Sequence, residues 1–141
     1  MREQKSYSSQ RTPQPRGTAM SVQRVSLLHF LFLTHFPASQ TLEVVYMDLC
    51  GPIQSQSLLG ARYFLIIINQ FTGYVMIKFL RNKSDAFGAF KDYKARSENL
   101  QGRKILKIVS DGVKEFCNCQ FKQLARESGF ENYIIPPYTL D

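Results

Sequence analysis

Apolar residues gather in short runs after residue 41, and the spacing within each run predicts its structure. Three runs are rich in β-branched and aromatic residues and read as strands: Leu42–Cys50, Arg62–Asn69 and Tyr74–Leu80. The first is apolar on both faces toward its end, so we expect it at the centre of a sheet with both sides covered. The tight turn Phe71–Gly73 predicts that the second and third strands form an antiparallel hairpin.

The spacing changes to that of a helix between Ser84 and Leu100, and Gly102 marks the end of this predicted helix. The residues that we expect on its inward face are Ala86, Phe87, Phe90, Tyr93 and Lys94. We expect the tyrosines Tyr63, Tyr74 and Tyr93 to serve packing rather than chemistry.

The remaining chain alternates between strand and helix. Ile105–Val109 is predicted as a fourth strand, Phe116–Ser128 as a second helix that ends at Gly129, and Phe130–Ile135 as a last short strand. The order is therefore β-β-β-α-β-α-β. Short connections followed by helical crossovers predict an α/β fold, with a mixed sheet flanked by helices.

Two of the predicted strands end in a carboxylate, Asp48 in the first and Asp111 directly after the fourth. If these strands lie side by side, both acids meet at the edge where open α/β sheets bind ligands. A buried carboxylate needs a cationic partner, because water solvates its charge far better than a protein interior does. The pair therefore predicts a divalent-metal site.

Each acid also has a structural alternative. Asp48 could form a turn before Gly51-Pro52, and Asp111-Gly112 could form a hairpin turn. The hairpin alternative is the weaker, because the segment that follows Asp111 is predicted to be helical rather than extended.

Charge is spread unevenly over the 141 residues. The chain carries a net charge of +7, and residues 1–40 contribute five basic groups against one acid. Lys114, Lys122 and Arg126 add cations at near-helical spacing on or beside the second predicted helix. Both features fit a polyanion such as DNA, although a solvated tail and a solvated helix face explain them equally well.

The first forty residues are predicted to be a poorly ordered basic arm, with an apolar segment at 25–36, ahead of a domain at 41–141. The segment is too short to cross a bilayer as a helix. It faintly resembles a signal-peptide core, yet it begins late and contains two histidines, so we favour a helix or strand packed beside the domain over secretion. A third alternative is a chance product of a rearranged reading frame. The three cysteines are read as free thiols of a reducing compartment.

From about Leu42 to Leu140, the chain resembles the catalytic core of copia-type retrotransposon integrases, which have a ribonuclease-H-like fold. The matching phrases occur in the family's order: Asp48-Leu49-Cys50-Gly51-Pro52, Gly60-Ala61-Arg62-Tyr63-Phe64-Leu65, Phe79-Leu80-Arg81-Asn82-Lys83-Ser84, Phe90-Lys91, Ser110-Asp111-Gly112 with Glu115-Phe116, and Pro137-Tyr138-Thr139. Each phrase is weak alone, and together they are specific.

The resemblance implies DNA integration by metal-dependent polynucleotidyl transfer, in which three acids hold two Mg²⁺ or Mn²⁺ ions. Asp48 matches the first acid and Asp111 the second. The third, a Glu about 35 residues after the second acid in such two-metal sites, would fall near position 146, past Asp141. Glu115 and Asp141 are poor substitutes, so we expect an incomplete site, a missing final helix and no strand-transfer activity.

Three departures from the family strengthen this expectation. Asn69-Gln70 stands where the family tends to have two acids, and Gly112-Val113-Lys114 replaces an Asn-Gly-Gly run. The family's His/Cys zinc-binding domain has no match in the first forty residues.

Two other readings stay open beside the integrase fragment: a DNA- or protein-binding remnant of the fold, and a pseudogene product without selected function. As the resemblance implies, we expect DNA as the partner, possible self-association, no membrane or small-molecule substrate, and nuclear or cytoplasmic residence.

Overall fold

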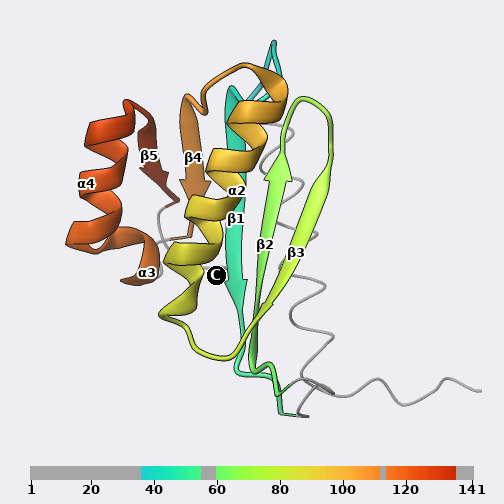
Figure 1. The fold of residues 1–141 in the computed structure, drawn as a ribbon, viewed down its shortest axis with the longest axis vertical. Coiled ribbons are helices and arrows are strands. Elements are labelled where there is room, and N and C mark those ends of the chain that lie inside the picture. Colours follow the sequence, from blue (N-terminus) through green and yellow to red (C-terminus); the bar gives the residue numbers. More distant parts are fainter. Residues whose placement is uncertain (1–35, 55–59, 112–113, 136–141) are drawn as a thin grey trace, which may run out of the picture.

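The structure is a computed structural model that describes residues 36–54, 60–111 and 114–135 (Figure 1). In chain order its elements are β1 (Val44–Cys50), β2 (Tyr63–Asn69), β3 (Val75–Leu80), α2 (Asp85–Gln101), β4 (Lys107–Ser110), α3 (Lys114–Cys117), α4 (Cys119–Ser128) and β5 (Glu131–Ile134). The predicted apolar segment at 25–36 lies outside these residues except for Phe36, as do His29, His35 and the Pro-Tyr-Thr phrase at 137–139.

The five strands form one mixed sheet in the order β3-β2-β1-β4-β5. β1, β2 and β3 pair antiparallel, whereas β4 runs parallel to β1 and β5 runs parallel to β4. The α/β fold and the hairpin are therefore confirmed, and the first and fourth strands lie side by side, which is the condition on which the expected meeting of the two acids depends. β1 is central and buried along its whole length, as predicted from its residues, which are all apolar except Asp48.

The described helices all pack on one side of the sheet, which we call the helix face (Figure 1). Its strand residues include Val45, Met47, Leu65, Ile67 and Ile108. The helices contribute chiefly aromatic residues, and the rings of Phe87, Phe90, Phe116 and Phe130 all lie around the ring of Phe121.

Side chains at the alternate positions of the strands point away from the helices, because neighbouring residues of a strand face opposite sides. We call this side the Asp48 face. Besides Asp48, its buried residues are Val44, Tyr46 and Cys50 of β1, Ile66 and Ile68 of β2, and Val109 of β4.

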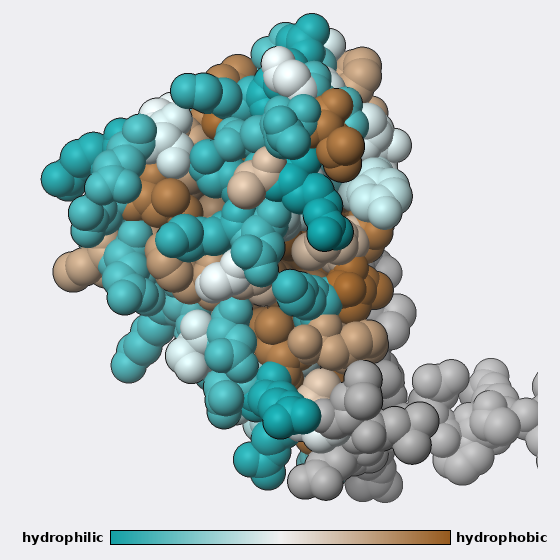
Figure 2. Space-filling model, in the orientation of Figure 1, coloured by the Kyte–Doolittle hydropathy of each residue, from teal (hydrophilic) through white to brown (hydrophobic). Residues whose placement is uncertain are grey.

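The Asp48 face continues onto the edge strand β3, where apolar side chains are exposed. Val75, Ile77 and Phe79 expose 47%, 53% and 62% of their surface. Ile77 pairs with Ile66, so this stripe lies on the same side of the sheet as Asp48. The opposite, helix side is largely hydrophilic, and hydrophobic residues come to the surface toward the β3 edge (Figure 2).

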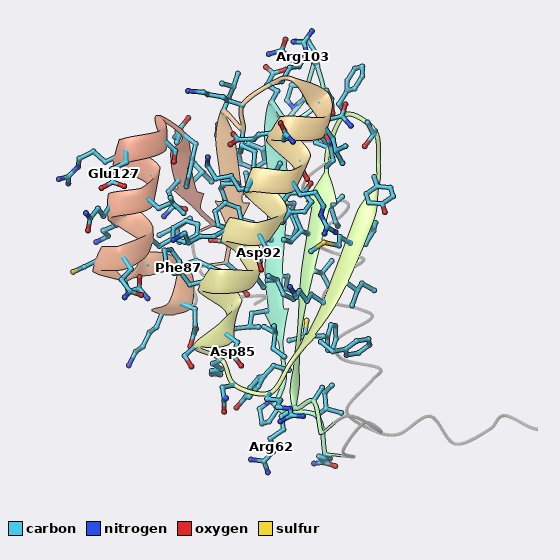
Figure 3. All side chains as sticks on the ribbon, in the orientation of Figure 1. Arg62, Asp85, Phe87, Asp92, Arg103 and Glu127 are labelled. Carbon is cyan, nitrogen blue, oxygen red and sulfur yellow. The ribbon has the colours of Figure 1, made fainter. Side chains whose placement is uncertain are left out.

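Helix α2 closely matches its prediction, with Ser84 and Gly102 at its two caps. The buried residues are Ala86, Ala89, Phe90 and Tyr93, while Phe87 is partly buried and points toward the α3–α4 side (Figure 3). Burial raises the pKa of the Tyr93 hydroxyl, because removal from water disfavours the phenolate.

The single helix predicted at 116–128 is wrong: the structure has α3 and α4, separated by Asn118. The backbone of Asn118 is extended, and its side-chain oxygen accepts a hydrogen bond from the Phe121 N–H at 2.9 Å. Asn118 therefore caps a new helix instead of continuing the first. Gly129 ends α4 as predicted.

Two further expectations need correction. β1 begins at Val44 rather than Leu42, because Leu42 has a left-handed backbone with φ of 64°. Asn69 supports this bend, since its amide donates to Thr41 Oγ1 at 2.9 Å. Tyr74 is exposed rather than packed, because β3 starts one residue later and lies at the sheet edge.

Glu98 ties the end of α2 to the chain that enters β4. Its carboxylate accepts a hydrogen bond from the Ile105 N–H at 2.8 Å and pairs with Lys94 Nζ at 2.6 Å, with both side chains mostly shielded from water. We expect Glu98→Ala to lower the free energy of unfolding by about 1–2 kcal/mol, since it leaves the Ile105 N–H without its acceptor. Urea unfolding followed by circular dichroism measures this. An unchanged midpoint in Glu98→Ala would contradict it, and the exposed Glu127→Ala on α4 is the control.

Among the described helices, none has both the length and the apolar character that crossing a bilayer requires.

Candidate functional site

Asp48 lies on the central strand β1, level with Ile66 of β2. Only 1% of its surface is exposed, and its neighbours on the same face are apolar. The Cys50 thiol donates to Asp48 Oδ2 at 3.3 Å, because residues two apart on a strand lie on one face. The carboxylate is thus held inside the sheet layer, in the low-polarity surroundings that favour pairing with a cation.

Asp111 follows the last residue of β4 and is partly exposed. The parallel ladder joins Val44 to Lys107 and Tyr46 to Val109, a constant offset of 63 positions. The same offset, continued by two residues, sets Asp111 level with Asp48 and on the same face. Level residues on neighbouring strands have backbones only about 4.8 Å apart. The expected meeting of the two acids at the carboxyl end of β4 therefore agrees with the register.

Gly51 shapes the chain just after Asp48. Its φ is +136°, and a Cβ built there would lie 2.5 Å from Tyr63 Cδ1 and 2.7 Å from the Arg62 carbonyl oxygen. Only glycine fits this conformation and this close approach. In the Asp-Leu-Cys-Gly-Pro phrase, the glycine thus lets the chain leave β1 while it stays in close contact with the start of β2.

The donor chemistry of the pair fits a hard divalent cation in part. Two carboxylates can supply oxygen ligands, and Mg²⁺ commonly keeps several waters beside one or two protein carboxylates. No group of three His, Cys, Asp or Glu side chains suited to a metal occurs within residues 36–54, 60–111 and 114–135. A third acid is thus not found beside Asp48 and Asp111 in the described chain, and Asp141 lies outside it.

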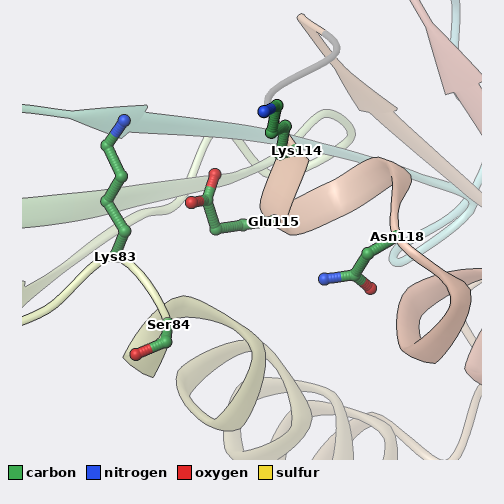
Figure 4. Close-up of a pocket in the computed structure, with 5 residues that line it drawn as sticks. All are labelled: Lys83, Ser84, Lys114, Glu115 and Asn118. Carbon is green, nitrogen blue, oxygen red and sulfur yellow. The ribbon is translucent and has the colours of Figure 1, made fainter.

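Glu115 belongs to a different feature, a hollow of about 450 Å³ between the start of α2 and the α3–α4 turn (Figure 4). Its lining residues are Lys83, Ser84, Lys114, Glu115 and Asn118. Glu115 Oε2 is buried and accepts no hydrogen bond from the described residues. The carboxylate points toward the Lys83 side of the hollow (Figure 4). The ammonium group of either Lys83 or Lys114 could therefore move to pair with it.

The predicted cations fall into two groups. Lys114 is the first residue of α3 and lines the hollow, whereas Lys122 and Arg126 lie one turn apart on the exposed side of α4. Lys83 was not among the predicted contacts, although it stands in the phrase Phe79–Ser84. Its position after a strand and just before a helix is the signal that could have singled it out. All three cysteines are free, as predicted.

A search of protein-family models found no match to this chain. Among curated proteins, it is 29% identical over 98 residues to the retrovirus-related Pol polyprotein from transposon TNT 1-94 of Nicotiana tabacum. It is also 29% identical over 103 residues to the Pol polyprotein from transposon RE2 of Arabidopsis thaliana. These alignments cover 70% and 72% of the chain, and the chain spans 7% of the length of each relative.

Solved structures give the same answer for the fold. The HTLV-2 integrase catalytic core domain in complex with magnesium superposes with a TM-score of 0.52, in both its dimeric and its trimeric form. Sequence identity is 11% and 12%, and the match covers 70% of this chain and 63% of the other. The resemblance read from the sequence phrases and the predicted ribonuclease-H-like fold are confirmed.

Proposed function

We propose that this chain is part of an integrase catalytic core whose Asp48 and Asp111 bind a divalent metal ion and whose cationic surface contacts DNA. The parallel β1–β4 pairing is the observation that supports the proposal most directly, because its offset of 63 positions, extended past Val109, would bring Asp111 level with Asp48. Similarity to retrotransposon Pol polyproteins supports it independently.

Asp48 and Asp111 are the residues that would hold the metal. Asp48 is rigid, since it lies within the central strand, and Asp111 begins a loop and can adjust. When bound, a divalent ion would supply charge stabilisation at phosphate oxygens and lower the pKa of a bound water. The chain's own part is to fix two carboxylates beside each other and to keep one of them away from bulk water.

We further propose that these 141 residues alone do not carry out strand transfer. Two-metal phosphoryl chemistry relies on acids held in fixed geometry, and a misplacement of about 1 Å can cost 100-fold in rate. The resemblance places the third acid near position 146, about 35 residues after Asp111 in the family's two-metal site. The second candidate function is a nucleic-acid-binding remnant, which the lysines of the hollow favour.

Metal binding is tested by titrating the protein with Mn²⁺ in a calorimeter. We expect weak binding, with a dissociation constant of about 1 mM, because two carboxylates give few ligands. Asp111→Asn should weaken this binding at least about tenfold, since it removes half of the carboxylate donors. Asp111 is the partly exposed acid, so the substitution leaves the core intact.

Asp92→Asn is the matched control, because Asp92 lies on the outer side of α2, away from the Asp48 face (Figure 3). Equal Mn²⁺ affinity in the unmodified protein, Asp111→Asn and Asp92→Asn would rule out the two-acid site.

DNA contact is tested by the salt dependence of binding to a duplex. We expect binding at low ionic strength that weakens steeply as salt is added, since Lys and Arg release counterions from phosphates. Lys114→Gln should lower the slope of log affinity against log salt by about 1. Lys104→Gln makes the same charge change before β4, at the other end of that strand, and should leave the slope unchanged. Absence of binding at low salt would sink the proposed contact.

We also propose that the protein self-associates, because the similar HTLV-2 domain is described in dimeric and trimeric forms. Sedimentation of the purified protein over a range of concentrations measures it.

A further inference from the structure

The Asp48 face is apolar and buried, yet the described helices lie on the other side of the sheet. Tyr46 and Val109 have 1% and 0% of their surface exposed. The described hydrophobic residues that pack against this cluster are Phe36, Ala38, Phe64 and Ile135. Of these, Phe36 and Ala38 come from the chain that precedes β1, so this segment already contributes to the cover.

Phe36 is held firmly where the chain reaches the sheet. Its ring packs edge-on against Tyr133 of β5, with centroids 5.0 Å apart, and Lys107 Nζ lies 5.0 Å from the centre of the same ring. Phe36 therefore marks the β4–β5 side of the Asp48 face as the entry point of the N-terminal chain.

The connection from Phe36 to β1 is also fixed. Glu43 Oε2 accepts hydrogen bonds from Ser39 N at 2.6 Å, Ser39 Oγ at 2.9 Å and Gln40 N at 3.2 Å. The Ser39 backbone N–H, followed by its hydroxyl, holds the pKa of Glu43 below its usual range. Arg103 donates to the Gln40 side chain from the end of α2. The chain thus enters the Asp48 face in one defined place.

The residues just before this anchor form the most apolar segment of the sequence. Residues 25–36, VSLLHFLFLTHF, contain eight apolar side chains and no Asp, Glu, Lys or Arg. A segment that is apolar on all sides is stable only when it is buried. Residues 25–35 would span about 16 Å as a helix and up to about 36 Å when extended. The distance from β4 across β1 and β2 to β3 is three strand spacings, about 14 Å.

We propose that residues 25–35 are the intramolecular cover of the Asp48 face, which they cross from Phe36 over β1 and β2 toward β3. The apolar stripe of Val75, Ile77 and Phe79 continues the face at its far edge. The N-terminal segment is then part of the domain rather than a tail attached to it.

The test uses the full chain with Cys50→Ala, Cys117→Ser and Cys119→Ser, to which one probe cysteine is added on β2. Ile68→Cys lies on the Asp48 face and Ile67→Cys on the helix face, and both positions are buried. The cover is then weakened by Leu28→Asp with Phe32→Asp. We expect thiol labelling to accelerate at least tenfold at position 68 and to stay slow at position 67.

Unchanged protection at position 68 would overturn the proposal. A second result would also overturn it: protection at position 68 that rises with protein concentration and does not change when the segment is substituted. A second copy of the chain would then be the cover.

If the chain with the two Asp substitutions unfolds, both positions become reactive. A cross-link made from a segment without these substitutions then tests the proposal. Leu31→Cys is combined with Ile77→Cys on the Asp48 face, or with Lys78→Cys, whose native side chain pairs with Asp92 of α2 on the other side. Both β3 positions are exposed. A short bis-maleimide should join position 31 to position 77 within one chain, and join it to position 78 much less. Equal yields, or links only between chains, would refute the proposed cover.

Discussion

Replacing Phe121 with alanine is expected to lower the free energy of unfolding by about 3–5 kcal/mol. Phe121 is fully buried, and its ring lies within 5.3 to 6.3 Å, centre to centre, of four other aromatic rings. These rings come from α2, α3 and the residue just before β5, so one truncation removes contacts from two helices and from the chain that enters the sheet. The surrounding helices are tied to the sheet at other points and cannot close the cavity fully.

Chemical denaturation of the purified protein measures this loss. The matched control is Phe71→Ala, the same change in a turn residue that is 55% exposed, and it should cost less than about 1 kcal/mol. A similar loss in the two variants would show that the aromatic cluster does not hold the helices to the sheet. A loss large enough to unfold Phe121→Ala at 25 °C agrees with the prediction, since small domains have only about 5–15 kcal/mol of stability.

Gly51→Ala is expected to be the second most damaging substitution, with a loss of about 2–4 kcal/mol. Two causes add. The backbone at φ of +136° is strained for any residue with a side chain, and the new Cβ would overlap the Tyr63 ring and the Arg62 carbonyl. The carbonyl is backbone and cannot turn away, so β1 and β2 would have to separate near Asp48.

Gly88→Ala is the control with the opposite expected sign. Gly88 lies on the exposed side of α2, where an added Cβ meets nothing within 4 Å. Alanine there should stabilise the helix by about 0.5–1 kcal/mol. Thermal unfolding of both variants under one condition measures the difference. If Gly51→Ala were as stable as Gly88→Ala, the close approach of Gly51 to β2 would be wrong.

Most of the fold could be predicted from the sequence because its strands and helices differ strongly in spacing. The apolar run of β1, interrupted only by Asp48, identified the central strand, and the change of period after Ser84 identified α2. The pairing of β1 with β4 could not be predicted from the sequence, since the crossover through α2 could have returned the chain beside another strand.

The errors arose where a single polar side chain overrides a pattern. Asn118 lies between apolar residues at helical spacing, yet its side chain caps α4 and ends α3. Asn69 has a comparable effect, because its amide supports the left-handed bend at Leu42 that delays the start of β1. The Asn118 bond is local, since Phe121 lies three positions on, and an Asn inside an apolar helical pattern could have signalled it. The Asn69 bond reaches Thr41, 28 positions away, and no local pattern signals it.

The residues of the candidate site also differ in how well the sequence pointed to them. Asp48 and Asp111 could be singled out as candidates because Asp48 lies near the end of the apolar strand β1 and Asp111 directly follows β4. Lys83 was missed: its position between a strand and a helix is visible in the sequence, but its place in the same hollow as Lys114 depends on how α2 and α3 approach each other in space. Periodicity identifies the face on which a residue lies, but not which residue of another element faces it.

The 63-position separation between paired residues of β1 and β4 has a consequence for the order of folding. Contacts far apart in sequence form slowly, because the chain between them must first be brought together. The antiparallel β1–β2–β3 meander, whose connections span residues 51–62 and 70–74, is expected to assemble early, with α2 close behind. The pairing of β4 with β1 would form only in the final steps, so most of the sheet would be in place before the end of β4 reaches β1.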